Sequence, residues 1–484
     1  MPRTLSLLAG LLAMIASPLL AQPTDAAPSA KVRERVAHYL AAVESPSAAQ
    51  AFQDQDMTAE AAAAAPPGAV AAYFAGQKRV LGGFDLLGLR MVSPRRAEVL
   101  LRDRVYGARH GLTMDFEAGP EARTTEFDPG PAPLWAPPLP RTLSTDMAAQ
   151  AAQRLAEQGC AAEVFSGAVL VARGDRVLVE HACGLASRRY GVPNTADTRF
   201  NLGSINKMFT AVAAMQLVEA GKVSLDDPLD RYLDPTWLPA EVSRTVTVRQ
   251  LLTHTSGLGS FVGREWDRSS RRLYRELADY KPLVRGETPA FPPGTGWSYS
   301  NTGPLLLGAV IEKASGENYF DYMRRHVYAP AGMHDTDCWP LDEPVPGLAT
   351  GHTLARDGSG WRENTVQNLF RGSPAGGGYS TTGDLLRFAR ALRAGRLVSK
   401  ASLDLMWTDH PPHGYGAGFT IETTAAGKAY GHDGIFAGVS TRFHIYPDTG
   451  FVVAILSNQD YGAPGLDEAL VEVFAQAQPD PSHP

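Results

Sequence analysis

The chain has 484 residues, of which 44% are hydrophobic and 20% are charged, so it can bury a sizeable core. Its length would accommodate about three average domains. The formal net charge is −6 and no long basic run occurs, which argues against nucleic acid as a main partner.

Residues 1–21 have the pattern of a secretory signal. Arg3 supplies a positive n-region, residues 5–15 form an apolar h-region, and Ala21 offers a small residue before cleavage ahead of Gln22. This apolar run is shorter than the ~20 residues that a membrane-spanning helix needs, and no other stretch is long and apolar enough. We therefore expect a secreted protein of a bacterial periplasm, with no stable membrane span after the signal is removed.

Residues 22–128 are predicted to form a small α+β domain. Apolar residues recur at helical spacing over residues 32–43, and a second short helix is expected over residues 69–77. Apolar and polar residues then alternate over residues 98–106 and 112–116, which indicates strands. Helices followed by antiparallel strands are typical of α+β domains. No catalytic cluster is evident in this segment, and we expect it to dock a partner or to self-associate.

A proline-rich stretch, residues 129–143, is predicted to be a stiff linker to a second domain over residues 144–478. That domain begins with a helix and a hairpin, continues through a mostly helical middle, and returns to strands near its end. Strands on both sides of a helical middle indicate one antiparallel sheet assembled from distant segments, with helices on its faces. The predicted strands are 165–172, 176–183, 416–422, 443–446 and 451–457, and the terminal helices are 146–158 and 467–476.

The chain has three cysteines, Cys160, Cys183 and Cys338, and an odd count excludes a fully paired framework within one chain. Cys160 and Cys183 flank one predicted strand pair and can be bridged in an oxidising compartment. The sequence does not decide this, and we expect the pair to be unbridged. No cysteine has the spacing of a metal ligand and no His-Glu-x-x-His occurs, so we predict neither a metal nor a cofactor.

Ser204 and Lys207 open a predicted buried helix. A serine hydroxyl is a poor nucleophile until a nearby base takes its proton. Side chains three positions apart share one face of a helix, so the Lys207 amine should meet the Ser204 hydroxyl, where free N–H groups of the first turn favour negative charge. This is the only Ser-x-x-Lys in the chain. Taken alone, however, such a match is more often a solvated serine and a surface lysine.

Tyr299-Ser300-Asn301 is the only Tyr-x-Asn in the chain. A phenol beside a lysine ammonium loses its proton more easily, so Tyr299 can act as a base toward Ser204 or toward an incoming water. Asn301 can offer its amide N–H groups to a substrate carbonyl and its oxygen to Lys207. Taken alone, the motif is better explained as a turn with a packed aromatic.

The segment Gly431-His432-Asp433-Gly434 lies on the strand side of the predicted cleft. A strand edge can bind a substrate backbone, and Gly434 permits close approach. The backbone N–H of Ile435 can pair with that of Ser204 as an oxyanion hole. Taken alone, His432 is more commonly an ordinary strand-end histidine.

The three motifs, in this order, resemble those of the class C β-lactamase-like serine hydrolases, which include penicillin-recognising D,D-peptidases and family VIII carboxylesterases. The resemblance covers about residues 145–475 and does not cover residues 22–140. His254 and the glycine run 376–378 match landmarks that we interpret as structural. Further agreeing segments are Phe165-Ser166-Gly167-Ala168-Val169-Leu170-Val171, Leu251-Leu252-Thr253-His254-Thr255-Ser256-Gly257-Leu258 and Pro374-Ala375-Gly376-Gly377-Gly378-Tyr379-Ser380-Thr381.

The resemblance implies an α/β fold, a β-lactamase/transpeptidase-like domain in which an antiparallel sheet flanked by helices packs beside an all-helical subdomain. It also implies two-step acyl transfer, in which Ser204 is acylated and water then releases the acyl group. Lys207 would activate Ser204, and Tyr299 would be the second base, although the step served by each stays open. Asn301 would position substrate, and His432 and Gly434 would hold the place of the family's Lys-Thr-Gly.

Two residues depart from that Lys-Thr-Gly pattern. His432 replaces a fixed cation by a side chain that is mostly neutral above its usual pKa of ~6.5. Asp433, if ionised and directed into the cleft, would repel a carboxylate. We therefore expect an esterase acting on small esters or amides without a free carboxylate. The alternatives are a D,D-peptidase, D-aminopeptidase or β-lactamase, and a non-catalytic binding or assembly protein that kept the fold.

Overall fold

The computed structural model describes residues 27–355, 360–409 and 413–479. The predicted signal segment, residues 1–21, lies outside the described residues. In the described part of the chain, no helix has both the length and the apolar character needed to cross a membrane. The chain divides into two compact units: unit 1 is Met1–Ser144, Arg154–Val164 and Gly465–Gln478, and unit 2 is Thr145–Gln153, Phe165–Pro464 and Pro479–Pro484.

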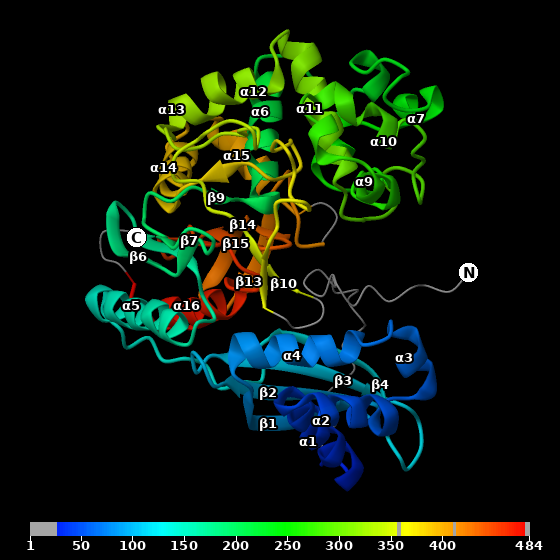
Figure 1. The fold of residues 1–484 in the computed structure, drawn as a ribbon, viewed down its shortest axis with the longest axis vertical. Helices are drawn as coiled ribbons and strands as arrows, with labels where there is room; N and C mark the ends of the chain where they lie inside the picture. The colour runs from blue at the N-terminus through cyan, green and yellow to red at the C-terminus, as the bar shows by residue number, and fades with distance from the viewer. Residues whose placement is uncertain (1–26, 356–359, 410–412, 480–484) are drawn as a thin grey trace. The chain divides into compact units, whose positions relative to one another are not determined.

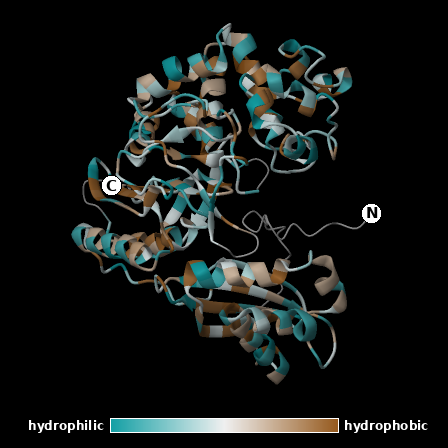
Figure 2. Cartoon of the chain, viewed as in Figure 1, coloured by the Kyte–Doolittle hydropathy of each residue, from teal (hydrophilic) through white to brown (hydrophobic). Residues whose placement is uncertain are grey.

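In unit 1, helices precede a four-stranded antiparallel sheet of order β1-β2-β3-β4 (Figure 1). Ser29 caps the first helix by accepting the N–H of Val32, and the rings of Tyr39, Phe52 and Phe74 pack edge to face. Both hydrophilic and hydrophobic residues are visible along α4 (Figure 2), which buries one face. The elements are α1 (Ala30–Glu44), α2 (Pro46–Ala51), η1 (Phe52–Asp56), α3 (Ala59–Ala64), α4 (Ala69–Leu81), β1 (Phe84–Ser93), β2 (Arg96–Asp103), β3 (Arg109–Phe116) and β4 (Thr124–Pro131).

The expected α+β character of this unit is confirmed, but two of its strands are not among the predicted ones. The register of β1 against β2 shifts between Leu86 and Gly88, and this bulge interrupts the alternation that marks a strand in sequence. Strand β4 contains Pro129 and Pro131, which the sequence assigns to the linker. Proline is tolerated here because β4 is an edge strand, where a missing N–H can face away from the ladder.

Unit 2 is built on a six-stranded antiparallel sheet of order β13-β14-β15-β16-β5-β6. Strand β16 pairs with β5, with Ile455 opposite Val169, so segments from the two ends of the domain are joined as the sequence predicts. Strands β5, β15 and β16 are buried along their whole length. The strands are β5 (Gly167–Arg173), β6 (Arg176–Cys183), β13 (Thr420–Thr424), β14 (Gly427–Phe436), β15 (Val439–Ile445) and β16 (Phe451–Ser457).

Short pairs of strands and a run of helices complete unit 2 (Figure 1). The strand pairs are β7 (Leu185–Ser187) with β8 (Val192–Pro193), β9 (Phe200–Asn201) with β12 (Tyr379–Ser380), and β10 (His352–Leu354) with β11 (Trp361–Glu363). The helices and helical turns are η2 (Gly203–Ile205), α6 (Asn206–Glu219), η3 (Leu229–Arg231), α7 (Ala240–Thr245), α8 (Val248–Leu252), α9 (Arg264–Arg268), η4 (Arg271–Leu273), η5 (Leu277–Tyr280), α10 (Lys281–Val284), α11 (Thr302–Ser315), α12 (Tyr319–Tyr322), η6 (Met323–Tyr328), α13 (Ala329–Ala331), α14 (Thr382–Arg393) and α15 (Lys400–Met406).

Helices α5 (Thr145–Ala161) and α16 (Pro464–Gln476) each contribute residues to both units. At the centre of unit 2, every residue of α6 from Asn206 to Met215 is buried. A helix buried on all sides is fixed in position by its surroundings. The first turn of α6, and the helical turn η2 before it, are therefore held rigidly.

Candidate active site

Ser204 lies in η2 and Lys207 in the first turn of α6, as the sequence predicts. The turn before Ser204 is shaped by Gly203, whose φ of +55° lies in the left-handed region that favours glycine. Asn201 accepts the Gly203 N–H at 2.9 Å, and the hydroxyl of Thr441 on β15 donates to the carbonyl of Leu202 at 2.9 Å. The nucleophile candidate is thus anchored to the sheet on one side and to α6 on the other.

Lys207 is a buried amine surrounded by neutral oxygen atoms. Its Nζ lies 3.0 Å from Ser204 Oγ, 2.9 Å from Asn301 Oδ1 and 2.5 Å from the carbonyl oxygen of Ala375. Burial lowers the pKa of Lys207 well below its ordinary value, because the charged form loses its hydration. A neutral amine has two N–H groups and one lone pair. Nζ donates to Ser204 Oγ, to Asn301 Oδ1 and to the Ala375 carbonyl; in the neutral form its two N–H groups can stay on the two carbonyl oxygens, which frees the lone pair for the Ser204 O–H.

Tyr299 lies beside Lys207, with its ring centroid 4.8 Å from Nζ. The buried phenol also hydrogen-bonds Ser204. Burial raises the pKa of Tyr299 above its ordinary value, and the hydrogen bond to Ser204 only partly offsets this. The phenol is therefore protonated at rest. The expected ease of forming phenolate is not seen, because burial raises the pKa of the phenol by more than its hydrogen bond lowers it.

Asn301 connects the lysine to a neighbouring loop. Its Oδ1 accepts from Lys207, and its Nδ2 donates to Ser260 Oγ at 3.0 Å. This orientation agrees with the expectation that the amide oxygen faces Lys207. Ser260 is exposed, so a substrate carbonyl that displaced its hydroxyl could accept the same amide N–H.

His432 is a neutral side chain whose two ring nitrogens are both occupied. Its Nδ1 lies 2.8 Å from the carbonyl of Asp433, which can only accept, so Nδ1 carries the proton. Its Nε2 then accepts the phenol O–H of Tyr415 at 3.1 Å. Burial lowers the pKa of His432 to about 3, because the charged form of the ring loses its hydration. A cation is therefore missing from the position that the family's lysine occupies.

Asp433 does not face Ser204. Residues alternate between the two faces of a strand, and the carboxylate of Asp433 forms an ion pair with Arg442, its partner in β15. Asp433 is therefore a paired carboxylate on the face of β14 opposite His432, and not an unpaired charge directed into the cleft. Glu422 and His444 lie beside it, with ligand atoms within 4.8 Å of one another. Because the Arg442 guanidinium already neutralises Asp433, a metal ion at this group would have to compete with a paired cation.

The edge of β14 supplies backbone N–H groups beside Ser204. Two hairpins fix the direction of the N–H groups along β14: Thr424 pairs with Gly427 at the turn from β13, and Phe436 pairs with Val439 at the turn into β15. Successive N–H groups of a strand point alternately to its two neighbours. The N–H of Ile435, next to Phe436, therefore points away from β15. Strand β13 begins at Thr420, which pairs with Gly431, so the residues of β14 after Gly431 have no strand on that side. There the edge of β14 lies against the turn before Ser204. A methyl group on Gly203 would lie 3.2 Å from the Ile435 nitrogen. The Ile435 N–H is thus placed next to the Ser204 turn, as an oxyanion hole requires.

Three contributors to this arrangement were missed in the sequence: the carbonyl of Ala375, the hydroxyl of Tyr415 and the ring of His254. Ala375 acts through its backbone, which leaves no trace in residue type. Tyr415 pairs with His432 from a segment before β13 that carries no recognisable motif. His254 belongs to one of the segments that match the family, but its contacts are made with residues distant in sequence, which motif spacing does not reveal.

The profile of the beta-lactamase family matches residues 148–478, which is more than half of the chain. The chain belongs to the beta-lactamase family. It is accordingly a serine hydrolase with the β-lactamase/transpeptidase-like fold that the motifs imply.

Relatives of this family member include penicillin-binding proteins and an esterase. Penicillin-binding protein 4* of Bacillus subtilis (strain 168) is 31% identical over 315 residues, which cover 61% of this chain and 68% of that protein. Esterase EstB of Burkholderia gladioli is 38% identical over 211 residues, which cover 40% of this chain and 53% of that protein. The crystal structure of a penicillin binding protein from Bacillus halodurans superimposes with a TM-score of 0.60 at 31% identity, covering 66% of this chain and 98% of that chain.

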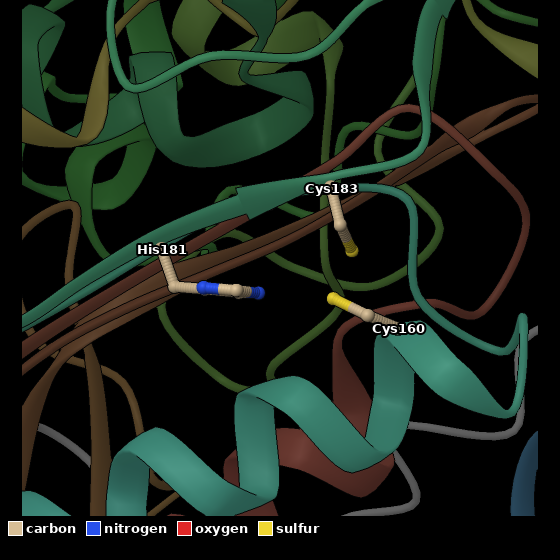
Figure 3. Close-up of side chains that lie close together, drawn as sticks. All are labelled: Cys160, His181 and Cys183. Atoms are coloured by element: carbon tan, nitrogen blue, oxygen red, sulfur yellow. The ribbon is translucent and has the colours of Figure 1, made fainter.

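A second group of potential ligands consists of Cys160 on α5 and His181 and Cys183 on β6 (Figure 3). Their ligand atoms lie within 4.8 Å of one another. Cys160 and Cys183 are disulfide-bonded, and Cys338 is a buried free cysteine. The expectation of an unbridged pair is therefore wrong: the strand brings Cys183 back beside the end of α5. A disulfide offers no thiolate, so in this oxidised form the group lacks its two sulfur ligands.

Proposed function

We propose that this family member is an exported esterase that hydrolyses small esters or amides through an acyl-enzyme on Ser204. The observation that carries the proposal is the fully buried amine of Lys207, whose pKa burial lowers well below its ordinary value and whose Nζ lies 3.0 Å from the Ser204 hydroxyl. A lowered pKa favours the neutral form of the amine, which is the form that can take the Ser204 proton.

The proposed reaction uses groups already in contact. Ser204 Oγ attacks the acyl carbon while its proton passes to Lys207, and the N–H groups of Ser204 and Ile435 bind the oxyanion. The Tyr299 phenol gives its proton to the departing oxygen and regains one from the Lys207 ammonium. Water then attacks the acyl-enzyme, losing a proton through the same pair, and Ser204 leaves as the hydroxyl. Tyr299 thus serves as a proton relay in both steps.

The choice of substrate rests on the charge beside the cleft. A neutral His432 offers no cation to a substrate carboxylate, and both of its nitrogens already have hydrogen-bond partners. D-Alanyl peptides and β-lactams carry such a carboxylate, whereas simple esters do not. The likeness to EstB supports the esterase proposal, and the likeness to penicillin-binding proteins supports the alternative of a D,D-peptidase, D-aminopeptidase or β-lactamase.

A panel of three substrates tests this proposal: a short-chain p-nitrophenyl ester, a peptide ending in D-Ala-D-Ala, and a chromogenic cephalosporin. We expect kcat/KM for the ester to exceed that for the other two, and Ser204→Ala to abolish all turnover. Peptide or cephalosporin turnover above that of the ester would contradict the substrate assignment. Ester turnover that survives Ser204→Ala would place the nucleophile elsewhere, and a wild type that fails to react would favour a binding protein.

Two features support export. Residues 1–21 have the pattern of a secretory signal, and Cys160 and Cys183 form a disulfide, a bond that persists in oxidising compartments. Sequencing the N-terminus of the periplasmic protein should give Gln22 as the first residue. An intact N-terminus on protein recovered from the cytoplasm would contradict export.

For the residues before the hydrolase domain, we propose self-association as the role. Edge strand β1 exposes Leu86 (48%) and Leu87 (40%), and an exposed apolar edge is a site at which strands of two chains can pair. Leu87→Glu should lower the molar mass measured by sedimentation toward that of a monomer. A wild type that is already monomeric would leave docking of a different partner as the role.

A further inference from the structure

His254 adopts a backbone conformation that side chains seldom take. It follows α8 with a φ of +58°, in the left-handed region, and the residue is 1% exposed. Histidine tolerates this region better than most residues, but not as well as glycine or asparagine. A strained, buried and polar residue within a hydrolase site suggests a use for the conformation, and the contacts of His254 show one.

Two hydrogen bonds join His254 to the backbone on either side of Tyr299. The N–H of Ser298 donates to the His254 carbonyl at 3.0 Å, and the N–H of Ser300 donates to His254 Nδ1 at 3.2 Å. Since an N–H can only donate, Nδ1 must be the unprotonated nitrogen, and the ring must be neutral. Burial lowers the pKa of His254 well below its ordinary value, which keeps the ring in that acceptor form.

The ring of His254 also contacts the side chain that it flanks. Its centroid lies 4.6 Å from the Tyr299 ring and 4.5 Å from the Tyr415 ring. Tyr415 in turn hydrogen-bonds His432. His254 therefore holds Tyr299 at three points, by a hydrogen bond on each side of its peptide unit and by a ring contact between them.

We propose that His254 is a positioning residue that fixes the phenol of Tyr299 against Ser204 and Lys207. This inference rests on the proposed function of Tyr299 as proton relay. His254 touches neither Ser204 nor the reacting acyl group in this account, and acts only through Tyr299. Proton transfer is sensitive to distances of tenths of an ångström, so loosening the 298–300 segment should lower kcat more than it raises KM.

A matched pair of amide substitutions tests the acceptor at Nδ1. In His254→Asn the amide oxygen is attached to Cγ, as Nδ1 is, and asparagine tolerates the left-handed region. In His254→Gln the amide is one carbon farther out, and the acceptor leaves that place. We expect kcat for ester hydrolysis to fall about tenfold to a hundredfold in His254→Gln, with KM changed less than about twofold. His254→Asn should recover most of the lost kcat.

All rates are normalised to the fraction of Ser204 that a fluorophosphonate probe titrates, so that partial unfolding does not count as lost chemistry. Equal kcat in the Asn and Gln variants, or an unchanged kcat in the Gln variant, would overturn the inference. So would a loss confined to KM.

A double-mutant cycle with Tyr299→Phe tests whether the effect passes through the phenol. If it does, adding His254→Gln to Tyr299→Phe should lower kcat by less than about twofold, since the group that His254 positions is already gone. A full additional loss in the Phe background would overturn the inference while leaving the acyl-enzyme on Ser204 intact. A wild type that shows no Ser204-dependent hydrolysis would instead contradict the proposed function itself.

Discussion

Lys207 shows how burial alone lowers the pKa of an amine. The partners within reach of its Nζ are a hydroxyl, an amide oxygen and a backbone carbonyl. Each can accept or share a proton, but none carries a negative charge that would stabilise an ammonium. The desolvation that lowers its pKa is therefore not offset by a counter-ion, which is the condition for a lysine that acts as a base.

Lys207→Arg replaces the amine by a group that cannot act as a base. Guanidinium remains protonated at all accessible pH values and cannot take the Ser204 proton. We expect kcat to fall on the order of 10²–10⁴-fold, the usual contribution of a positioned proton-transfer group. Lys222→Arg, at an exposed lysine beyond the end of α6, serves as the control and should leave kcat unchanged. An active Lys207→Arg enzyme would show that another group activates Ser204.

His432 should make the protein sensitive to acid. Its folded pKa is lowered to about 3, below the ~6.5 of an unfolded histidine, so below pH 6.5 the unfolded chain binds a proton that the folded chain does not. The stability that neutral His432 contributes is present above pH 6.5 and is lost progressively as pH falls toward 3. Each pH unit in that window costs about 1.4 kcal/mol.

Thermal melting of wild type and His432→Asn from pH 8 to pH 4 measures this contribution. The difference in Tm between the two proteins should shift in favour of the variant as pH falls below 6.5. A difference that stays constant with pH would contradict the assigned neutral state of His432.

The residue scale also shows what sequence can reveal of the site. Ser204 and Lys207 were predicted to meet because one helical turn fixes their separation, and their 3.0 Å contact confirms it. The direction of the Tyr299 pKa shift was not predictable, since it depends on how deeply the fold buries the phenol. The Ala375 carbonyl could not be foreseen, because any residue type supplies one.

At the scale of elements, the site depends on the close approach of β14 to the turn before Ser204. A Cβ on Gly434 would lie 2.1 Å from the Leu202 carbonyl oxygen and 2.2 Å from Thr441 Oγ1. Both neighbours belong to fixed parts of the fold, a backbone carbonyl and a side chain that itself hydrogen-bonds Leu202. Only glycine permits this approach, and it brings the Ile435 N–H beside Ser204.

Gly434→Ala should push the strand edge and the turn apart. We expect kcat to fall about 10²–10³-fold, as when one donor of an oxyanion hole is removed. Gly286→Ala is the control, because a Cβ there meets no atom within 4 Å and its activity should match wild type. Wild-type kcat in a folded Gly434→Ala protein would contradict the oxyanion role assigned to this edge.

Sequence patterns found the elements that are regular and missed those that are not. Buried strands such as β5 and β16 were recognised from short apolar runs, and their pairing was inferred from the order of elements. β1 escaped because its bulge breaks the period of two, and β4 because prolines are usually read as a linker. The direction of the Ile435 N–H could be determined only once the register of β14 against its neighbouring strands was known.

At the scale of the whole molecule, unit 1 includes the C-terminal helix α16, whose residues lie far away in sequence. His110 on β3 forms ion pairs with Asp103 and with Glu468 of α16, and Arg109 pairs with Glu472. Burial alone would lower the pKa of His110, but the two carboxylates outweigh it and raise the pKa to about 10. A charged imidazole thus holds a helix from the end of the chain against a strand near its beginning.

His110→Gln should weaken this attachment in a pH-dependent way. A raised folded pKa contributes stability that is fully present below the unfolded pKa of ~6.5 and is lost as pH rises through about 10. Wild type should therefore have a higher Tm than the variant at pH 6, and the difference between the two Tm values should decrease toward pH 10. His334→Gln, at a histidine of unit 2, serves as the control. A difference in Tm that increases with pH would contradict a charged His110.

The measurement that tests the central claim most directly is the rate at which a fluorophosphonate labels Ser204 as a function of pH, with the adduct located by peptide mass spectrometry. A neutral Lys207 predicts one adduct, on Ser204, and a labelling rate that has already reached its plateau at neutral pH. An adduct on another residue would contradict the account, as would a rate that keeps rising toward the ~10.4 pKa of an ordinary lysine.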